Sequence, residues 1–223
     1  MRNIIGFSLF FFLISCAALP PPEPSVENKI NNIYLSRNFD PKALETDGIA
    51  ILPMPVKIAP EGIRNNAIFE IQQAMQIYFP KARIVKKDEM VTNIRNAGMN
   101  REFDLLIKGL SENKTVDRSL LSKVGEIGKA RFLLYAEIKE FKTNSTNIYN
   151  SDIIKIVEIE AEILDVRCPD PVWKGSGSTK VVESVNIDKI RMEEIFVNAT
   201  KNLISSLATA DKAEGREEVK ACF

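Results

Sequence analysis

The chain has 223 residues, of which 45% are hydrophobic and 27% charged, so it can build a globular core. Lys plus Arg and Asp plus Glu both number 30, a balance that lacks the basic excess of nucleic-acid-binding proteins. The sequence contains no histidine, which excludes the Ser-His-Asp and Cys-His catalytic sets. We therefore expect no enzyme and no cofactor.

The first sixteen residues have the build of a secretory leader. Arg2 precedes an apolar run at 4–14, which is too short to span a bilayer as a mature helix. The run ends in Leu13-Ile14-Ser15-Cys16, which resembles the lipobox of bacterial lipoproteins, where the cysteine receives acyl chains such as palmitate and becomes the new amino terminus. We predict a signal peptide over 1–15 and lipidation of Cys16. The alternative is an ordinary signal sequence with a chance cysteine.

Two cysteines remain once Cys16 is assigned to the lipid. Cys168 and Cys222 form a candidate disulfide in an oxidising compartment, and they are too few for a thiolate zinc site. The bridge would tie the C-terminal tail, residues 211–223, to the turn that begins at Cys168. Two unpaired thiols are the alternative.

The segment 16–47 is expected to hold the domain near the membrane. Four prolines within 17–28 favour a semi-rigid polyproline II tether. Residues 29–47 form an approach segment, in which a short helix around 30–35 is one interpretation. The folded domain is then expected over 48–210.

Short strands alternate with amphipathic helices in the first half of this domain. Gly48–Pro53 is a short apolar run flanked by glycine and proline, which favours a buried strand. Pro60 and Glu61 then open a helix whose apolar residues recur at three- and four-residue steps until Pro80. The remaining expected elements are a strand at Ala82–Val85, a helix capped by Asp88, a helical stretch at Arg101–Lys108 and a helix at Ser119–Ile127.

Strands dominate the second half. Phe132–Ile138 is apolar at nearly every position, which predicts a strand covered on both faces, and Thr143–Asp152 is a polar loop. From Val157 to Ile163, apolar residues alternate with glutamates, so one face of this strand points inward and the other outward. A phase shift at Leu164 indicates a bulge.

A return strand and a final helix complete the domain. After a turn at Cys168-Pro-Asp-Pro171, a strand is expected from Val172 to about Val185. Asp188 then opens a helix with an apolar stripe that continues to Leu207. The expected order is β-α-β-α-α-β-β-β-α, with the stretch at 101–108 as a further helix.

Few residues suggest a site. Gly175–Ser178 lacks the lysine of a phosphate-binding loop, so its small residues indicate close packing by another backbone. Glu158, Glu160 and Glu162 read as a solvated face on which nothing separates their pKa values. Trp173 is either a packing residue at the hairpin end or a partner contact.

The pattern from Gly48 onward resembles a group of bacterial envelope lipoproteins with a fold like the amino-terminal domain of TolB, the LpoB/CsgG-like group. The opening strand Ile49–Pro53, the strand Phe132–Ile138 and the hairpin Ile159–Asp165 with Val172–Gly177 carry this resemblance. It implies a single α/β domain with a mixed sheet flanked by helices. The acidic row on the hairpin does not suit the lipid-facing hairpins of pore-forming members.

The resemblance and the leader together imply a lipid-anchored accessory or assembly subunit of a larger cell-envelope complex. Its partners would be an envelope protein or further copies of the chain, with no nucleic acid. Ala17 is not the aspartate that retains many lipoproteins in the inner membrane, so the periplasmic side of the outer membrane is expected, with the cell surface as the alternative. A periplasmic carrier or binding protein for a lipid or small ligand is the competing function, and it would need an apolar pocket.

Overall fold

The computed structural model describes residues 23–55, 59–112, 116–146, 152–168, 170–184 and 190–210. The predicted signal peptide, Cys16 and Cys222 lie outside the described residues, so their predicted lipidation and pairing stay predictions.

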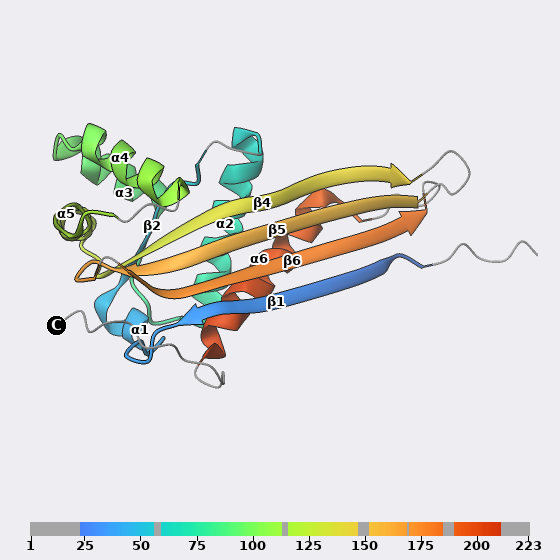
Figure 1. The fold of residues 1–223 in the computed structure, drawn as a ribbon, viewed down its shortest axis with the longest axis horizontal. Helices are drawn as coiled ribbons and strands as arrows, with labels where there is room; N and C mark the ends of the chain where they lie inside the picture. Colours follow the sequence, from blue (N-terminus) through green and yellow to red (C-terminus); the bar gives the residue numbers. More distant parts are fainter. Residues whose placement is uncertain are drawn as a thin grey trace, which may run out of the picture.

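In the described ranges, six strands form one mixed sheet in the order β1-β6-β5-β4-β2-β3 (Figure 1). Parallel pairing joins β2 to both β3 and β4, whereas the β4, β5, β6 and β1 neighbours are antiparallel. The expected fold class, a single α/β domain with a mixed sheet flanked by helices, is confirmed. The strands are β1 (Ser25–Leu35), β2 (Ile49–Ile51), β3 (Ile84–Val85), β4 (Phe132–Thr146), β5 (Asp152–Asp165) and β6 (Pro171–Ser184).

Six helices within the described residues cover the two faces unequally. On one face of the sheet, α2 and α6 pack against β4, β5 and β6. On the other face, α3, α4 and α5 cover only the end of the sheet near β2 (Figure 1). The far ends of β4, β5, β6 and β1 extend past α3–α5. The helices are α1 (Ala43–Asp47), α2 (Glu61–Tyr78), α3 (Lys87–Asn96), α4 (Asn100–Ser111), α5 (Arg118–Gly128) and α6 (Met192–Ala208).

The segment before Gly48 contributes to the sheet. Residues Ser25–Leu35 form β1, which pairs with β6 from Val182 to Trp173. The helix predicted around 30–35 is therefore wrong, and the sheet edge begins at Ser25, within the predicted tether, and continues into the predicted approach segment. The alternation of apolar and charged residues in this strand is confined to Val26–Ile30, and the conformation of an edge strand depends on tertiary pairing, so the sequence did not predict it.

The hairpin strands are longer than the sequence predicts. β4 continues to Thr146 and β5 begins at Asp152, so both ends of the predicted polar loop belong to strands. The bulge expected at Leu164 is confirmed, since the pairing of β5 with β6 shifts register between Ile163 and Leu164. A second shift, between Ile138 and Glu140, lies in β4.

Glycines on β6 allow α6 to lie close to the sheet. A Cβ added at Gly177 would lie 2.3 Å from the carbonyl oxygen of Ala199 and 2.6 Å from the backbone nitrogen of Leu203. At Gly175 the added Cβ would meet the indole of Trp173 at 2.6 Å. The predicted close packing of a backbone against Gly175–Ser178 is confirmed at Gly177.

Helix ends follow local chemistry in part. Asp117 caps α5, and its carboxylate accepts a hydrogen bond from the Leu120 N–H at 3.0 Å. Asp88 lies in the first turn of α3 rather than at its cap, which is Lys86, so the predicted capping role is wrong. An acidic residue in a first turn still interacts favourably with the helix dipole.

Candidate interaction surface

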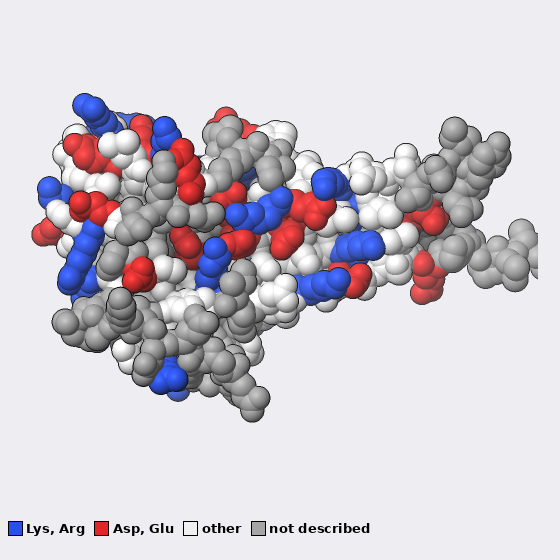
Figure 2. Space-filling view, viewed as in Figure 1, with Lys and Arg blue, Asp and Glu red and all other residues white. Residues whose placement is uncertain are grey.

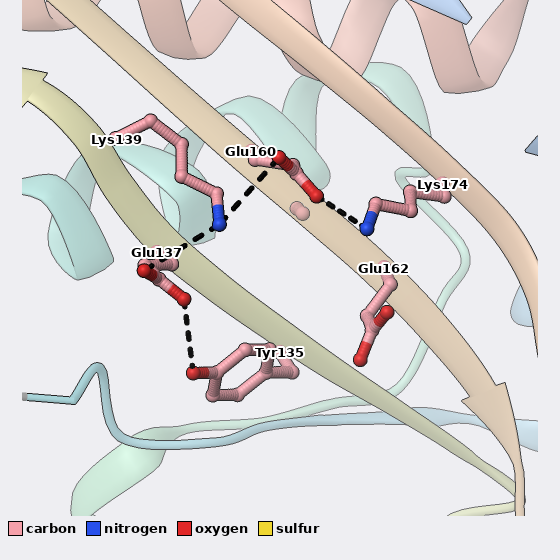
Figure 3. A pocket seen from close by; sticks show the side chains of 7 residues that line it. Tyr135, Glu137, Lys139, Glu160, Glu162 and Lys174 are labelled. Carbon is pink, nitrogen blue, oxygen red and sulfur yellow. Dashed lines mark hydrogen bonds and ion pairs between the residues drawn. The ribbon is translucent and has the colours of Figure 1, made fainter. Parts of the chain in front are cut away.

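A cluster of polar side chains lies on the sheet face that α3–α5 leave partly uncovered. We call it the charged face, and it consists of Tyr135, Glu137 and Lys139 on β4, Glu160 and Glu162 on β5, and Lys174 on β6 (Figure 3). Alternation in the three neighbouring strands brings these residues to the same side. Glu162 is directly opposite Tyr135 on one side and Lys174 on the other.

Ion pairs connect most of this cluster. Glu160 lies between two amines, at 2.5 Å from the Lys174 nitrogen and 3.7 Å from the Lys139 nitrogen. Lys139 also lies 3.5 Å from Glu137 Oε1, and the other oxygen of that carboxylate, Oε2, accepts a long hydrogen bond from the Tyr135 hydroxyl at 3.5 Å. Three carboxylates and two amines leave one excess negative charge.

Glu162 carries that excess charge. Within the described residues it forms no ion pair or hydrogen bond. Burial raises the pKa of the Glu162 carboxyl, while the nearby Lys174 opposes the rise. The expectation of a solvated row with equivalent pKa values is therefore wrong at Glu162. Burial and the adjacent Glu137 also raise the pKa of the Tyr135 hydroxyl.

The charged face is accessible from solvent. The side chains of Lys174 and Lys139 are 27% and 32% exposed, and that of Glu160 is 21% exposed. Acidic and basic groups lie side by side along this part of the sheet (Figure 2). A surface of complementary charges fixes register and orientation of a protein partner more than it adds raw affinity.

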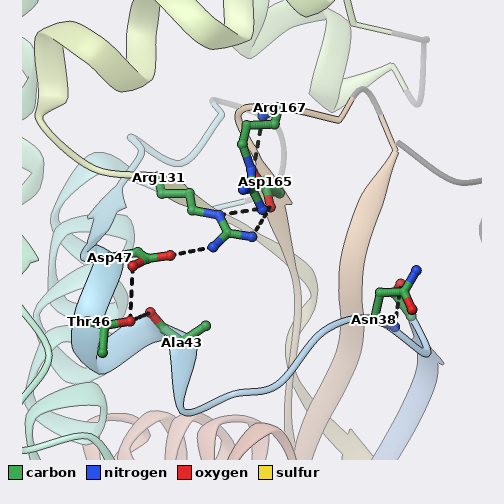
Figure 4. Close-up of polar contacts among 8 residues, drawn as sticks. Asn38, Ala43, Thr46, Asp47, Arg131, Asp165 and Arg167 are labelled. Carbon is green, nitrogen blue, oxygen red and sulfur yellow. Dashed lines mark hydrogen bonds and ion pairs between the residues drawn. The ribbon is translucent and has the colours of Figure 1, made fainter. Parts of the chain in front are cut away.

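A second polar network has a structural role. Arg131 lies between Asp47, before β2, and Asp165, at the end of β5, and it donates to Asp165 Oδ2 at 2.7 Å (Figure 4). Arg167 donates to the same carboxylate at 2.8 Å. Burial raises the pKa of Asp165 against the effect of Arg131, whereas the hydrogen bond from Arg131 lowers the pKa of Asp47.

Sequence reasoning missed this network, because residue spacing gives no signal for it. Arg131 and Asp47 are 84 positions apart, and Arg131 and Asp165 are 34 apart. Only the pairing of β4 with β2 and β5 brings these side chains together. The network therefore joins the three strands at their common end.

Trp173 does not lie at the surface. Its side chain is 0% exposed in the core beneath α6, which agrees with the packing interpretation and not with the alternative of a partner contact. Cys168 is buried and disulfide-bonded, while Cys222 lies outside the described residues. The pairing of Cys168 with Cys222 therefore stays a prediction.

A hollow of about 290 Å³ lies between the segment after β2 and α4. Its lining is mixed, because the charged Asp104 and Lys108 sit beside the apolar Met54 and Phe103. Among the described residues there is no group of three acidic, cysteine or histidine side chains that could hold a metal ion. No helix in the described part of the chain is both long and apolar enough to cross a membrane.

No protein-family model matches the chain, and no curated protein matches it. Solved structures with a related arrangement include bacterial lipoproteins. The PelC dodecamer from Paraburkholderia phytofirmans is 11% identical, with a TM-score of 0.44 over 83% of this chain and 98% of that chain.

A second structure is a lipoprotein by name, and a third is a domain of LpoB. Lipoprotein GNA1162 from Neisseria meningitidis is 18% identical, with a TM-score of 0.46 over 71% of this chain and 98% of that chain. The LpoB C-terminal domain from Salmonella enterica is 11% identical, with a TM-score of 0.34 over 61% and 93%. With TM-scores below 0.5, none of these likenesses assigns a family or a function to this chain.

Proposed function

We propose that this protein is a lipid-anchored envelope lipoprotein that acts as an accessory or assembly subunit of a larger cell-envelope complex. The anchor is Cys16, and the protein is held on the periplasmic side of the outer membrane. The observation that carries the proposal is the open charged face, in which ion-paired side chains surround Glu162, a carboxylate without a cation of its own among the described residues.

A protein partner suits the chemistry of this surface. The amines of Lys139 and Lys174 already pair with Glu160, so a partner lysine or arginine would find Glu162 as its counter-ion. Because that carboxylate is partly buried and the surrounding dielectric is lower, an added cation would interact with it more strongly than with an exposed carboxylate. The chain contains no histidine, the usual general base near neutral pH.

The test is affinity purification of the full-length chain from bacterial envelopes, followed by mass spectrometry. We compare the wild type with Cys16→Ala and with the charge reversal Glu162→Lys. Glu126→Lys, an exposed position on α5, is the matched control for an acidic-to-basic change away from the charged face.

The proposal expects one envelope complex to co-purify with the wild type and with Glu126→Lys. We expect at least a tenfold loss of that complex with Glu162→Lys, and loss from membranes with Cys16→Ala. Recovery of the same proteins with Glu162→Lys would contradict docking through the charged face. Elution of the chain with a bound lipid and no protein would favour the carrier function instead.

A further inference from the structure

The strand β1 forms one long edge of the sheet, which no other described strand covers. It has eleven residues, Ser25–Leu35, and within the described residues it pairs only with β6. The pairing is regular from Ser25 to Asn32, where a register shift interrupts it. Proteins normally shorten, cover or break such edges, because unpaired backbone groups recruit another strand. No proline or glycine interrupts β1.

The two faces of β1 differ in chemistry. Val26 and Ile30 lie opposite Val181 and Gly177, on the α6 side of the sheet, and are 46% and 47% exposed. Glu27 and Lys29 point to the opposite face and pair with each other at 3.1 Å. Asn28 lies at the centre of this four-residue pattern.

We propose that β1 pairs antiparallel with β1 of a second copy of the chain, about a two-fold axis at Asn28. In this register Val26 lies opposite the partner's Ile30, and Glu27 lies opposite the partner's Lys29. Directly opposite residues of an antiparallel pair share a face, so apolar residues meet on one side and opposite charges on the other. The edge is self-complementary, as a two-fold interface requires.

The charges select this register over its neighbours. A register shifted by two residues in either direction keeps the faces matched. It places Glu27 opposite the partner's Glu27, or Lys29 opposite the partner's Lys29. Like charges directly opposite each other destabilise strand pairing. Registers shifted by one residue would bring the charged face of β1 in one copy to the same side as the apolar face of β1 in the other. The charged residues would then be buried beside α6.

This inference deepens the proposed function, on which it rests only in naming a second copy as one partner of an assembly subunit. The paired sheets would present both charged faces on the same side. The edge and the charged face are different surfaces, so each can be tested without the other.

The first test is disulfide cross-linking of the full-length chain in its membrane. Asn28→Cys places two thiols across the axis, where opposite Cβ atoms are about 4.5–5.5 Å apart. Asn31→Cys is the matched control on the same strand, since its two copies would lie about 20 Å apart along the strand direction. We expect a reducible dimer with Asn28→Cys above the wild-type background, and none with Asn31→Cys.

The second test exchanges charges at the edge. Glu27→Lys or Lys29→Glu alone should weaken dimerisation about tenfold, because two pairs per dimer become repulsive. The double variant Glu27→Lys/Lys29→Glu should restore it, and a mixture of the two single variants should form heterodimers. Sedimentation of the detergent-solubilised full chain measures each dissociation constant.

A chain that stays monomeric, or equal cross-linking at both positions, would overturn the proposal. Cross-linking of Asn28→Cys only to a different protein would overturn it too and would assign the edge to another partner. Loss of the envelope complex with Glu162→Lys while the dimer persists would leave this inference standing. A wild-type chain that forms no dimer but still recovers the envelope complex would reject the inference and leave the proposed function intact.

Discussion

Lys155 and Glu183 form a buried ion pair, with the amine nitrogen 2.5 Å from a carboxylate oxygen and side chains that are 7% and 0% exposed. The amine also donates to the Ile190 carbonyl at 2.6 Å, and the Ile190 N–H donates to the other Glu183 oxygen at 3.2 Å. The pair therefore holds the backbone that enters α6 against β5 and β6.

Removal of one member of this pair should be costly. Lys155→Met leaves Glu183 as an uncompensated buried charge, so we expect a loss of about 3–5 kcal/mol in the free energy of unfolding. The double variant Lys155→Met/Glu183→Met should be less destabilised than either single variant. Urea unfolding of all four proteins gives the coupling energy. Additive losses would show that the two charges do not interact.

Gly177 should not tolerate a side chain. Because an added Cβ would meet the α6 backbone at Ala199 and Leu203, Gly177→Ala should destabilise the protein by about 1–3 kcal/mol. Gly62→Ala in α2 is the control, since nothing lies within 4 Å of its added Cβ and alanine favours helices. Thermal unfolding compares the two, and equal effects would contradict the close packing of α6.

Arg131 should matter more than Arg167, although both contact Asp165. The Arg131 side chain is 29% exposed and bridges two carboxylates, whereas that of Arg167 is 49% exposed. We expect Arg131→Met to cost about 2–3 kcal/mol and Arg167→Met to cost under about 1 kcal/mol. Arg131→Lys should restore little, because an ammonium cannot reproduce the guanidinium fork. Chemical denaturation measures all three variants.

Glu162 should make stability depend on pH in a defined direction. Its pKa is raised in the folded state, so the ionised carboxylate is disfavoured there relative to the unfolded chain. Stability contributed by this group should rise as the pH falls through the raised pKa toward 4.5, the usual value. NMR titration should give an elevated pKa for Glu162, and Lys174→Met should raise it further.

The isosteric change Glu162→Gln isolates this contribution. It should increase the stability at pH 7 and flatten the pH dependence between 4.5 and 7, because the neutral amide carries no desolvation penalty of a charge. Unfolding measured across this range is the readout. An unchanged pH profile would mean that the carboxylate is fully solvated.

The predicted bridge between Cys168 and Cys222 can be tested by intact mass and peptide mapping. A cysteine at each end would close a loop of 55 residues, for which the chain-entropy model gives about 4 kcal/mol. Cys222→Ser should lower stability by about that amount in oxidising buffer and have little effect after reduction. Mapping of Cys168 to a different cysteine would refute the predicted pairing.

Local pattern accounts for much of the fold. The alternation at 157–163, the apolar run at 132–138 and the stripe of α6 identified their elements, because burial on one or two faces leaves a period in the sequence. β1 and α1 escaped, since an edge strand and a five-residue helix depend on tertiary contacts. The pKa shift of Glu162 escaped as well, because its burial results from packing between strands.

The place where β1 begins has a further geometric consequence. Ser25 pairs with Val182, so the start of β1 lies at the same end of the sheet as the β4–β5 ends at Thr146 and Asp152. Nine peptide units separate Ser25 from Cys16, and they extend to about 32 Å at most. With Cys16 lipidated, that end of the sheet would be held within the length of this segment from the bilayer. If that anchor is present, the length of the strands allows the α3–α5 end to lie up to about 50 Å farther from the membrane than the end where β1 begins.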